Sequence, residues 1–207
     1  IIESCAFEKC KQLETVIFSE NSKLHTICDY AFSRSTIKKF KAPFHLTKIC
    51  DGAFFKCKCL RNFDVPLDCK LEVIEKDAFY NAGIEKFYCP SNISRIYDGA
   101  FNNCPLLREF TFPLNSKVTL LDYDLFMQSK LTSFLMPSSV KKICSSCFED
   151  CTKMKKFEIP ENSELEVIEK NAFFHSAITS FSFPKKVSVI GENIFTYCYS
   201  LQIIEFC

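Results

Sequence analysis

Apolar residues return along this chain in one fixed frame. Each frame reads as an aliphatic residue, two variable residues, Ile, three variable residues, a small residue and Phe, as in 71–79 and 165–173. The gaps between successive Phe residues alternate strictly between 25 and 22 residues. This gapped periodicity predicts a solenoid of stacked coils. Coils 1 to 9 are numbered here by their column Phe: Phe7, Phe32, Phe54, Phe79, Phe101, Phe126, Phe148, Phe173 and Phe195.

A short extended stretch follows each column Phe. It consists of an aliphatic residue, two variable residues, usually Phe, one variable residue, an apolar residue and often Pro, as in 107–113 and 154–160. The alternation and the aromatic content predict a strand, and the Pro, which has no N–H to donate, marks its end. The first, fourth and sixth positions are expected to face inward, and the third and fifth to face outward.

Odd and even coils differ in the length of the loop after the strand. Odd coils carry a longer loop, as in 66–71, and even coils a shorter one, as in 90–93. The repeating unit is therefore a pair of coils, and the longer loops are expected to project on one edge of every second coil. The repeat runs through residues 1–207 without a linker, which predicts one domain. Neither end shows a polar cap, so we expect a fragment lacking both caps.

Composition and charge exclude several function classes. The apolar fraction of 47% is ample for a core, and the formal net charge of +1 argues against a nucleic-acid binder driven by phosphate electrostatics. No run approaches the ~18 apolar residues of a membrane span. The three His residues form no triad-like pattern with Ser, Cys or carboxylates, and no glycine loop could cradle a phosphate. We therefore predict a protein that is not an enzyme and has no cofactor and no metal site.

Five of the fourteen cysteines form a regular column three residues after the column Phe of the odd coils. They are Cys10, Cys57, Cys104, Cys151 and Cys198. The even coils place Ser or Ala there: Ser35, Ala82, Ser129 and Ser176. A column of Cys, Ser and Ala is a small packing position in which Cys behaves as a small hydrophobe. These cysteines are predicted to pack rather than to react.

Cys144 and Cys147 have the C-x-x-C spacing of redox and zinc sites. Cys147 occupies the small column and is expected to be buried, whereas Cys144 follows the Ile column and is expected to point outward. A zinc site calls for a second pair of ligands, and a thioredoxin-like site calls for a βαβ context. The sequence shows neither, so a zinc- or redox-active module is the least favoured hypothesis.

Cys28 and Cys50 both follow the Ile column, in neighbouring coils. Stacking of the coils would bring their Cα atoms to about 5 Å, within the range of a disulfide. We expect a bond between them if the protein is exported, and free thiols in a reducing compartment.

The repeat frame resembles that of the BspA-like leucine-rich repeat proteins, the surface-protein type found in bacteria and protists. Residues 91–113 come nearest to that repeat, and the resemblance covers the whole chain. It implies a leucine-rich repeat solenoid, and many such proteins resemble surface proteins that adhere to host cells, matrix proteins or other microbes. The chain departs from the family in having only 4 Gly and in its strict alternation of coil lengths.

We therefore predict an α/β-type repeat solenoid. It is expected to be a leucine-rich repeat arc of nine coils, with a parallel sheet on one face and short turns or 3-10 segments elsewhere.

The outward strand positions vary freely while the inward ones stay apolar, so we place recognition on the outward face. The predicted partner-binding residues are Lys39, Lys41, Asn62, Asp64, Lys86, Tyr88, Glu109, Thr111, Lys156 and Glu158. Lys39, Lys41, Lys86 and Tyr88 are expected to form a basic cluster that could anchor an acidic partner segment. A solvated face kept soluble by Lys, and recognition by the long-loop edge, are the alternatives.

The leading hypothesis is a non-enzymatic protein-binding solenoid, the repeat region of a cell-surface or extracellular adhesion protein. Its partners would be host or matrix proteins, with no nucleic acid and no membrane insertion by this segment. The alternative is an intracellular structural scaffold, in which neighbouring repeats or chains cover the ends.

Overall fold

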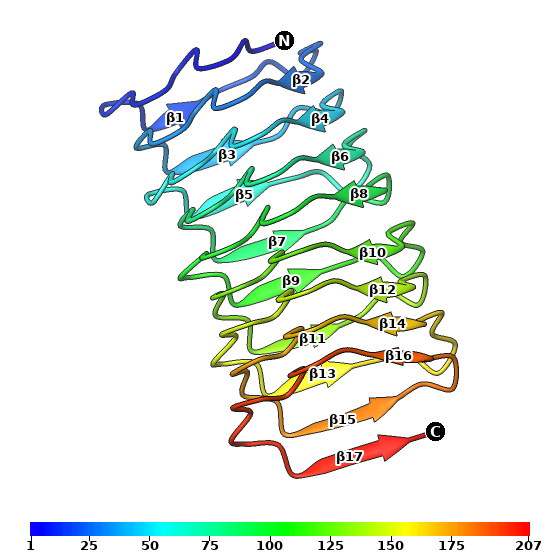
Figure 1. The fold of residues 1–207 in the computed structure, drawn as a ribbon. Coiled ribbons are helices and arrows are strands. Elements are labelled where there is room, and N and C mark those ends of the chain that lie inside the picture. The colour runs from blue at the N-terminus through cyan, green and yellow to red at the C-terminus, as the bar shows by residue number, and fades with distance from the viewer.

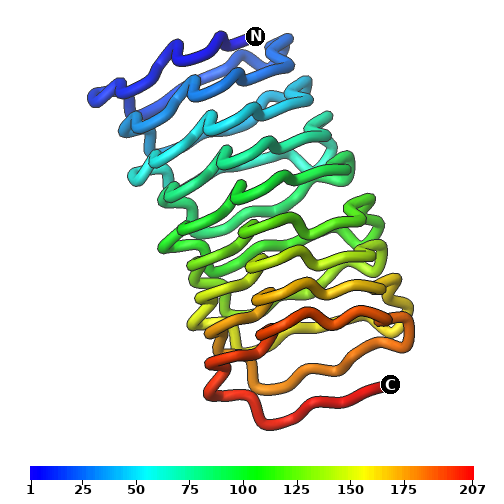
Figure 2. The backbone as a smooth tube through the Cα atoms, in the orientation of Figure 1, coloured from blue at the N-terminus to red at the C-terminus, as the bar shows by residue number.

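The chain winds into a solenoid of stacked coils whose two ends lie at opposite ends of the stack (Figures 1 and 2). The computed structural model describes residues 1–207 and contains two series of parallel strands. The long-strand face consists of β1 (Thr15–Val16), β3 (Lys39–Lys41), β5 (Asn62–Asp64), β7 (Lys86–Tyr88), β9 (Glu109–Thr111), β11 (Ser133–Leu135), β13 (Lys156–Glu158), β15 (Ser180–Phe183) and β17 (Ile203–Phe206). The short-strand face consists of β2 (Thr26–Ile27), β4 (Lys48–Ile49), β6 (Val73–Ile74), β8 (Arg95–Ile96), β10 (Leu120–Leu121), β12 (Lys142–Ile143), β14 (Val167–Ile168) and β16 (Val189–Ile190).

The predicted parallel-strand solenoid is confirmed, with two differences. The Ile column forms a second parallel ladder, in which Ile27 pairs with Ile49 and Ile49 with Ile74, whereas the sequence predicted one sheet. The segments between the strands are turns, as expected, but they include no helix and no 3-10 segment, although the sequence predicted an α/β-type solenoid. The solenoid is therefore built from strands and turns alone.

A third set of hydrogen bonds joins the coils where the chain turns around each column Phe; we call this side the turn edge. The Phe54 N–H donates to the Ala78 carbonyl at 2.8 Å, and the Lys56 N–H to the Tyr80 carbonyl at 2.7 Å. The residues two before and two after each column Phe have positive φ in every coil, and only two of these eighteen positions hold Gly. Side chains in this left-handed region cost about 1–2 kcal/mol each, which the inter-coil hydrogen bonds offset.

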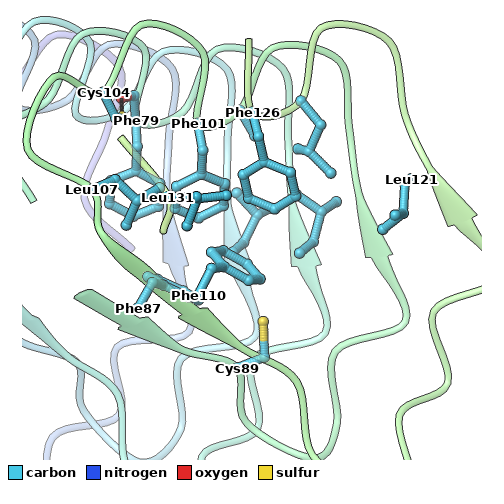
Figure 3. Close-up of a cluster of buried hydrophobic side chains, with 14 of the residues drawn as sticks. Phe79, Phe87, Cys89, Phe101, Cys104, Leu107, Phe110, Leu121, Phe126 and Leu131 are labelled. Carbon is cyan, nitrogen blue, oxygen red and sulfur yellow. Dashed lines mark hydrogen bonds between the residues drawn. The ribbon is translucent and has the colours of Figure 1, made fainter. Parts of the chain in front are cut away.

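Two columns of Phe rings form the core (Figure 3). Rings stack within a column, as for Phe79 and Phe101 at 5.1 Å and 11°. They meet edge to face between columns, as for Phe101 and Phe110 at 4.9 Å and 77°. Offset-stacked and T-shaped pairs are the favourable aromatic arrangements. Alternating the two lets Phe continue along the whole stack, beside columns of Ile, Leu, Ala and Cys.

The Cys column lies beside this core. Cys57 is buried, and its Sγ donates to the Phe32 carbonyl oxygen at 2.9 Å. Cys104, Cys151 and Cys198 make the same bond to the preceding column Phe at 3.0–3.2 Å. Burial raises the pKa of Cys57 to about 11 and those of Cys104 and Cys151 to about 12. These thiols are neutral packing groups, since nucleophilic attack needs the thiolate.

The stack loosens between coils 5 and 6. Strand pairing is interrupted on both faces there, between β9 and β11 and between β8 and β10, and Figure 1 shows the wider step. Leu125 stands where most coils have Ala, and the Phe101 and Phe126 rings lie 6.0 Å apart. The hydrogen bond from the Phe101 N–H to the Leu125 carbonyl oxygen still joins the coils, at 3.1 Å. The larger residue in the small column therefore coincides with a wider spacing between coils 5 and 6 and with the interruption of strand pairing.

Candidate interaction surfaces

The long-strand face presents the outward strand positions to solvent. Each of β3, β5, β7, β11 and β13 has a buried central Phe between two exposed side chains. In β9 the side chain before the buried Phe110, that of Glu109, is half-buried. All ten residues predicted from the sequence lie on this face. Their placement follows from the alternation, while their role in binding stays a prediction.

The predicted basic cluster is divided on this face. Lys86 lies 2.8 Å from Glu109, and the Tyr88 hydroxyl donates to the same carboxylate at 2.9 Å. The Lys86 ammonium and the Tyr88 hydroxyl lower the pKa of Glu109 below its ordinary value. Lys86 and Tyr88 are therefore already engaged with a carboxylate of the next coil.

Lys156 and Glu158 also pair with each other, at 2.9 Å within β13.

Lys39 and Lys41 have no carboxylate within 4.0 Å, although Lys41 pairs in register with Asp64. Beside them the surface is hollowed into a depression of about 490 Å³. Its lining includes the apolar side chains of Ile17 and Phe44, which are 88% and 40% exposed. This end of the long-strand face thus combines exposed apolar groups and two lysines without an ion-pair partner with the carboxylates of Glu20 and Asp64.

The short-strand face carries an ion pair in each of three successive two-coil units. A basic residue before the Ile column of an odd coil meets an acidic residue after the Ile column of the next coil. The pairs are Lys48–Glu75, Arg95–Asp122 and Lys142–Glu169. Sequence reasoning missed them, although the basic and the acidic residues each recur at intervals of 47 residues.

Arg95 and Asp122 bridge the loosened step between coils 5 and 6. The Arg95 Nη2 donates to the Asp122 carboxylate at 2.6 Å, and Asp122 is only 2% exposed. Burial and the neighbouring Asp98 carboxyl raise the pKa of Asp122, while Arg95 and the Tyr123 N–H oppose the rise. This pair supplies contacts at the point where both strand ladders stop.

A cluster with metal-ligand chemistry lies on the same face. Donor atoms of Asp29, Cys50 and Glu75 come within 4.8 Å of one another. The Lys48 ammonium lies 2.6 Å from Glu75, and burial raises the pKa of Cys50 to about 12. A cation of the protein thus already neutralises Glu75. The arrangement favours an ion-paired cluster over a metal centre.

The expectation that Cys144 points outward is wrong. Cys144 is 1% exposed, because it follows the second ladder and is enclosed near Lys142 and Glu169. Burial raises its pKa to about 12, and Cys147 is fully buried with a pKa well above its ordinary value. Both are free thiols, so the C-x-x-C spacing joins two packing positions.

Cys28 and Cys50 lie in stacked coils, as expected, since the Cys50 N–H donates to the Ile27 carbonyl. Both are free thiols.

His175 is the one histidine with a carboxylate partner. Its Nδ1 lies 2.7 Å from Asp150 on the turn edge, and the Gln128 side chain donates to the same carboxylate at 3.4 Å. The three residues occupy the same position, two after the column Phe, in successive coils. They form an exposed polar ladder without a nucleophile.

Residues 1–108 and 72–202 match a protein-family model described as "BspA type Leucine rich repeat region (6 copies)". A comparison with curated proteins found no match. The structure consists of strands and turns and contains no candidate membrane-spanning helix.

Three solved structures have similar folds. A leucine-rich repeat protein from Bacteroides ovatus has a TM-score of 0.60 and 19% identity, over 97% of this chain and 68% of that one. The pneumococcal vaccine antigen PcpA has a TM-score of 0.58 and 21% identity, over 93% of this chain and 56% of that one. A leucine-rich cell surface protein from Faecalibacterium prausnitzii has a TM-score of 0.51 and 17% identity, over 98% and 75%. Identities this low establish a shared fold alone.

Proposed function

The chain belongs to the BspA-type leucine-rich repeat family, and from this membership we propose that it is the protein-binding repeat region of a cell-surface adhesion protein. Leucine-rich repeat proteins generally mediate protein interactions, and the family is usually non-enzymatic. Two of the similar structures are described as a cell surface protein and a vaccine antigen. These descriptions support a surface location, and a host or matrix protein as the partner is part of our proposal.

The proposal rests on the end of the long-strand face where Lys39 and Lys41 have no ion-pair partner. Lys39 and Lys41 flank the buried Phe40 and stand beside the exposed Ile17 and Phe44. Interfaces combine an apolar centre with a polar rim, and charges without an internal partner remain available to a partner. An acidic protein segment with apolar side chains would complement this surface.

Binding of purified host and matrix proteins to the immobilised chain tests the proposal. A Lys39→Ser/Lys41→Ser variant is compared with Lys76→Ser/Lys170→Ser, which removes the same charge from residues outside the long-strand face. We expect at least one partner whose binding falls about tenfold in the first variant, the loss of roughly 1.4 kcal/mol, and stays unchanged in the second. Equal binding by both variants would exclude this face.

The location has its own test in the cysteines. If the protein is exported, we expect Cys28 and Cys50 to be joined, and mass measurement with and without reductant on protein from its native cells detects the bond. Reduced thiols at both positions would favour the intracellular scaffold.

A further inference from the structure

The turn edge of coils 1 to 3 carries a cluster of cations that the proposed function does not use. A depression of about 310 Å³ lies there, away from the outward strand positions of the long-strand face. Its lining consists of Lys11, Arg34, Ser35, Thr36, Lys56, Lys58 and Cys59. It therefore contains four cations and no carboxylate.

The four cations have no anionic partner in the chain. None of them has a carboxylate within 4.0 Å. The Lys11 ammonium donates to the Arg34 carbonyl oxygen at 2.8 Å, and the Lys56 Nζ lies 4.9 Å from the centre of the Phe55 ring. Such contacts hold the side chains in place and leave the positive charge uncompensated.

The edge offers little besides charge to a ligand. The Arg34 and Lys56 N–H groups already donate to the carbonyls of Phe55 and Tyr80, both at 2.7 Å. A partner strand therefore finds no free donors at these positions. The Phe55 ring stacks on Tyr80 at 5.0 Å and 14°, and Lys56 and Arg34 lie over the Phe55 ring. A nucleic-acid base would find no free face of Phe55 on which to stack.

From these contacts we propose that this edge binds a linear sulfated polysaccharide. The coils repeat about every 4.8 Å, so the cations of successive coils form a row along the edge. A polymer with sulfate groups at short intervals matches such a row by charge alone. The site is independent of the long-strand face and of any protein partner bound there.

A fully sulfated heparin octasaccharide is the probe, and binding to the whole chain is measured by calorimetry at several salt concentrations. The variant Lys11→Gln/Lys56→Gln/Lys58→Gln removes three of the four cations. The control Lys130→Gln/Lys153→Gln/Lys155→Gln removes three positive charges from coils 6 and 7. Thermal melting of both variants checks that the fold is intact.

We expect wild-type affinity that falls with added salt, a loss of at least about tenfold in the first variant, and a change below about threefold in the control. Equal losses in the two variants would overturn the site. Equal or tighter binding of a desulfated octasaccharide, or of single-stranded DNA of matched charge, would overturn the ligand class.

Discussion

Coils 2 to 4 and coils 6 to 8 are offset by two repeat units, or 94 residues. Their buried contacts are alike, whereas their exposed side chains differ. Phe32 and Phe54 stack at 5.2 Å, and their counterparts Phe126 and Phe148 at 5.4 Å. Cys57 and Cys151 each donate to the carbonyl of the preceding column Phe.

On the surface the two regions diverge. Lys39 and Lys41 correspond to Ser133 and Leu135. On the turn edge the residues that correspond to Arg34, Lys56 and Lys58 are Gln128, Asp150 and Thr152. Because the backbone and the core are alike in both places, the fold does not require the cations of coils 1 to 3. Their presence is in keeping with the two binding sites proposed above.

The largest expected effect tests the shared core. Phe54→Ala and Phe148→Ala should each lower the free energy of unfolding by about 3–5 kcal/mol, since each removes a fully buried ring. Urea unfolding followed by circular dichroism measures both. The comparison fails if one variant loses less than about 1 kcal/mol while the other loses the full amount, because the two columns would then not be equivalent.

A smaller effect is expected at the step that separates the two regions. Asp122→Ala leaves the Arg95 guanidinium without its 2.6 Å partner, where both strand ladders are interrupted. We expect a loss of about 1.5–3 kcal/mol, the range for a hydrogen bond to a charged group. Hydrogen exchange should show faster exchange in coils 5 and 6 than in wild type. Unchanged exchange there would mean that the ring stack and the turn edge suffice to join the coils.

The smallest effect distinguishes two equivalent carboxylates. Glu75 pairs with Lys48, whereas Glu169 pairs with Lys142 and also accepts hydrogen bonds from the Ser145 N–H and hydroxyl, both at 3.0 Å. Glu169→Ala should therefore cost about 1 kcal/mol more than Glu75→Ala, since exposed ion pairs alone contribute less than about 1 kcal/mol and the Glu169 variant also loses the hydrogen bonds from Ser145. Thermal unfolding of the two variants side by side measures the difference. A larger loss for Glu75→Ala would indicate that the Asp29–Cys50–Glu75 cluster has a role beyond packing.

The sequence predicted the core because one residue type at one spacing is buried in each of the inner coils 2 to 8. Phe101 and the Cys column follow from that rule alone. The second ladder was missed because the residues beside the Ile column, such as Lys48 and Val73, vary in polarity and show no regular alternation. The burial of Cys144 was missed for the same reason.

The surface sites were harder to predict because they depend on which coils are neighbours. Lys86 belongs to a row of outward residues in the sequence, but only the structure shows that Glu109 of the next coil neutralises it. The turn-edge cations Lys11, Arg34 and Lys56 lie at positions that read as variable. Their clustering becomes visible only when coils are aligned on the residues two and four after the column Phe.

The most direct test of the account grafts the cations of one region onto the other. In a chain carrying Lys11→Gln/Lys56→Gln/Lys58→Gln, the substitutions Gln128→Arg, Asp150→Lys and Thr152→Lys place cations at the equivalent positions of coils 6 and 7. Residues 128 and 150 have nearly the same positive φ as Arg34 and Lys56, so the backbone should tolerate the changes. Loss of the contacts of Asp150 with His175 and Gln128 should cost up to about 1 kcal/mol. Calorimetry with the sulfated octasaccharide should show binding restored to within about threefold of wild type. A folded graft that does not bind would contradict the claim that the surface positions alone carry this function.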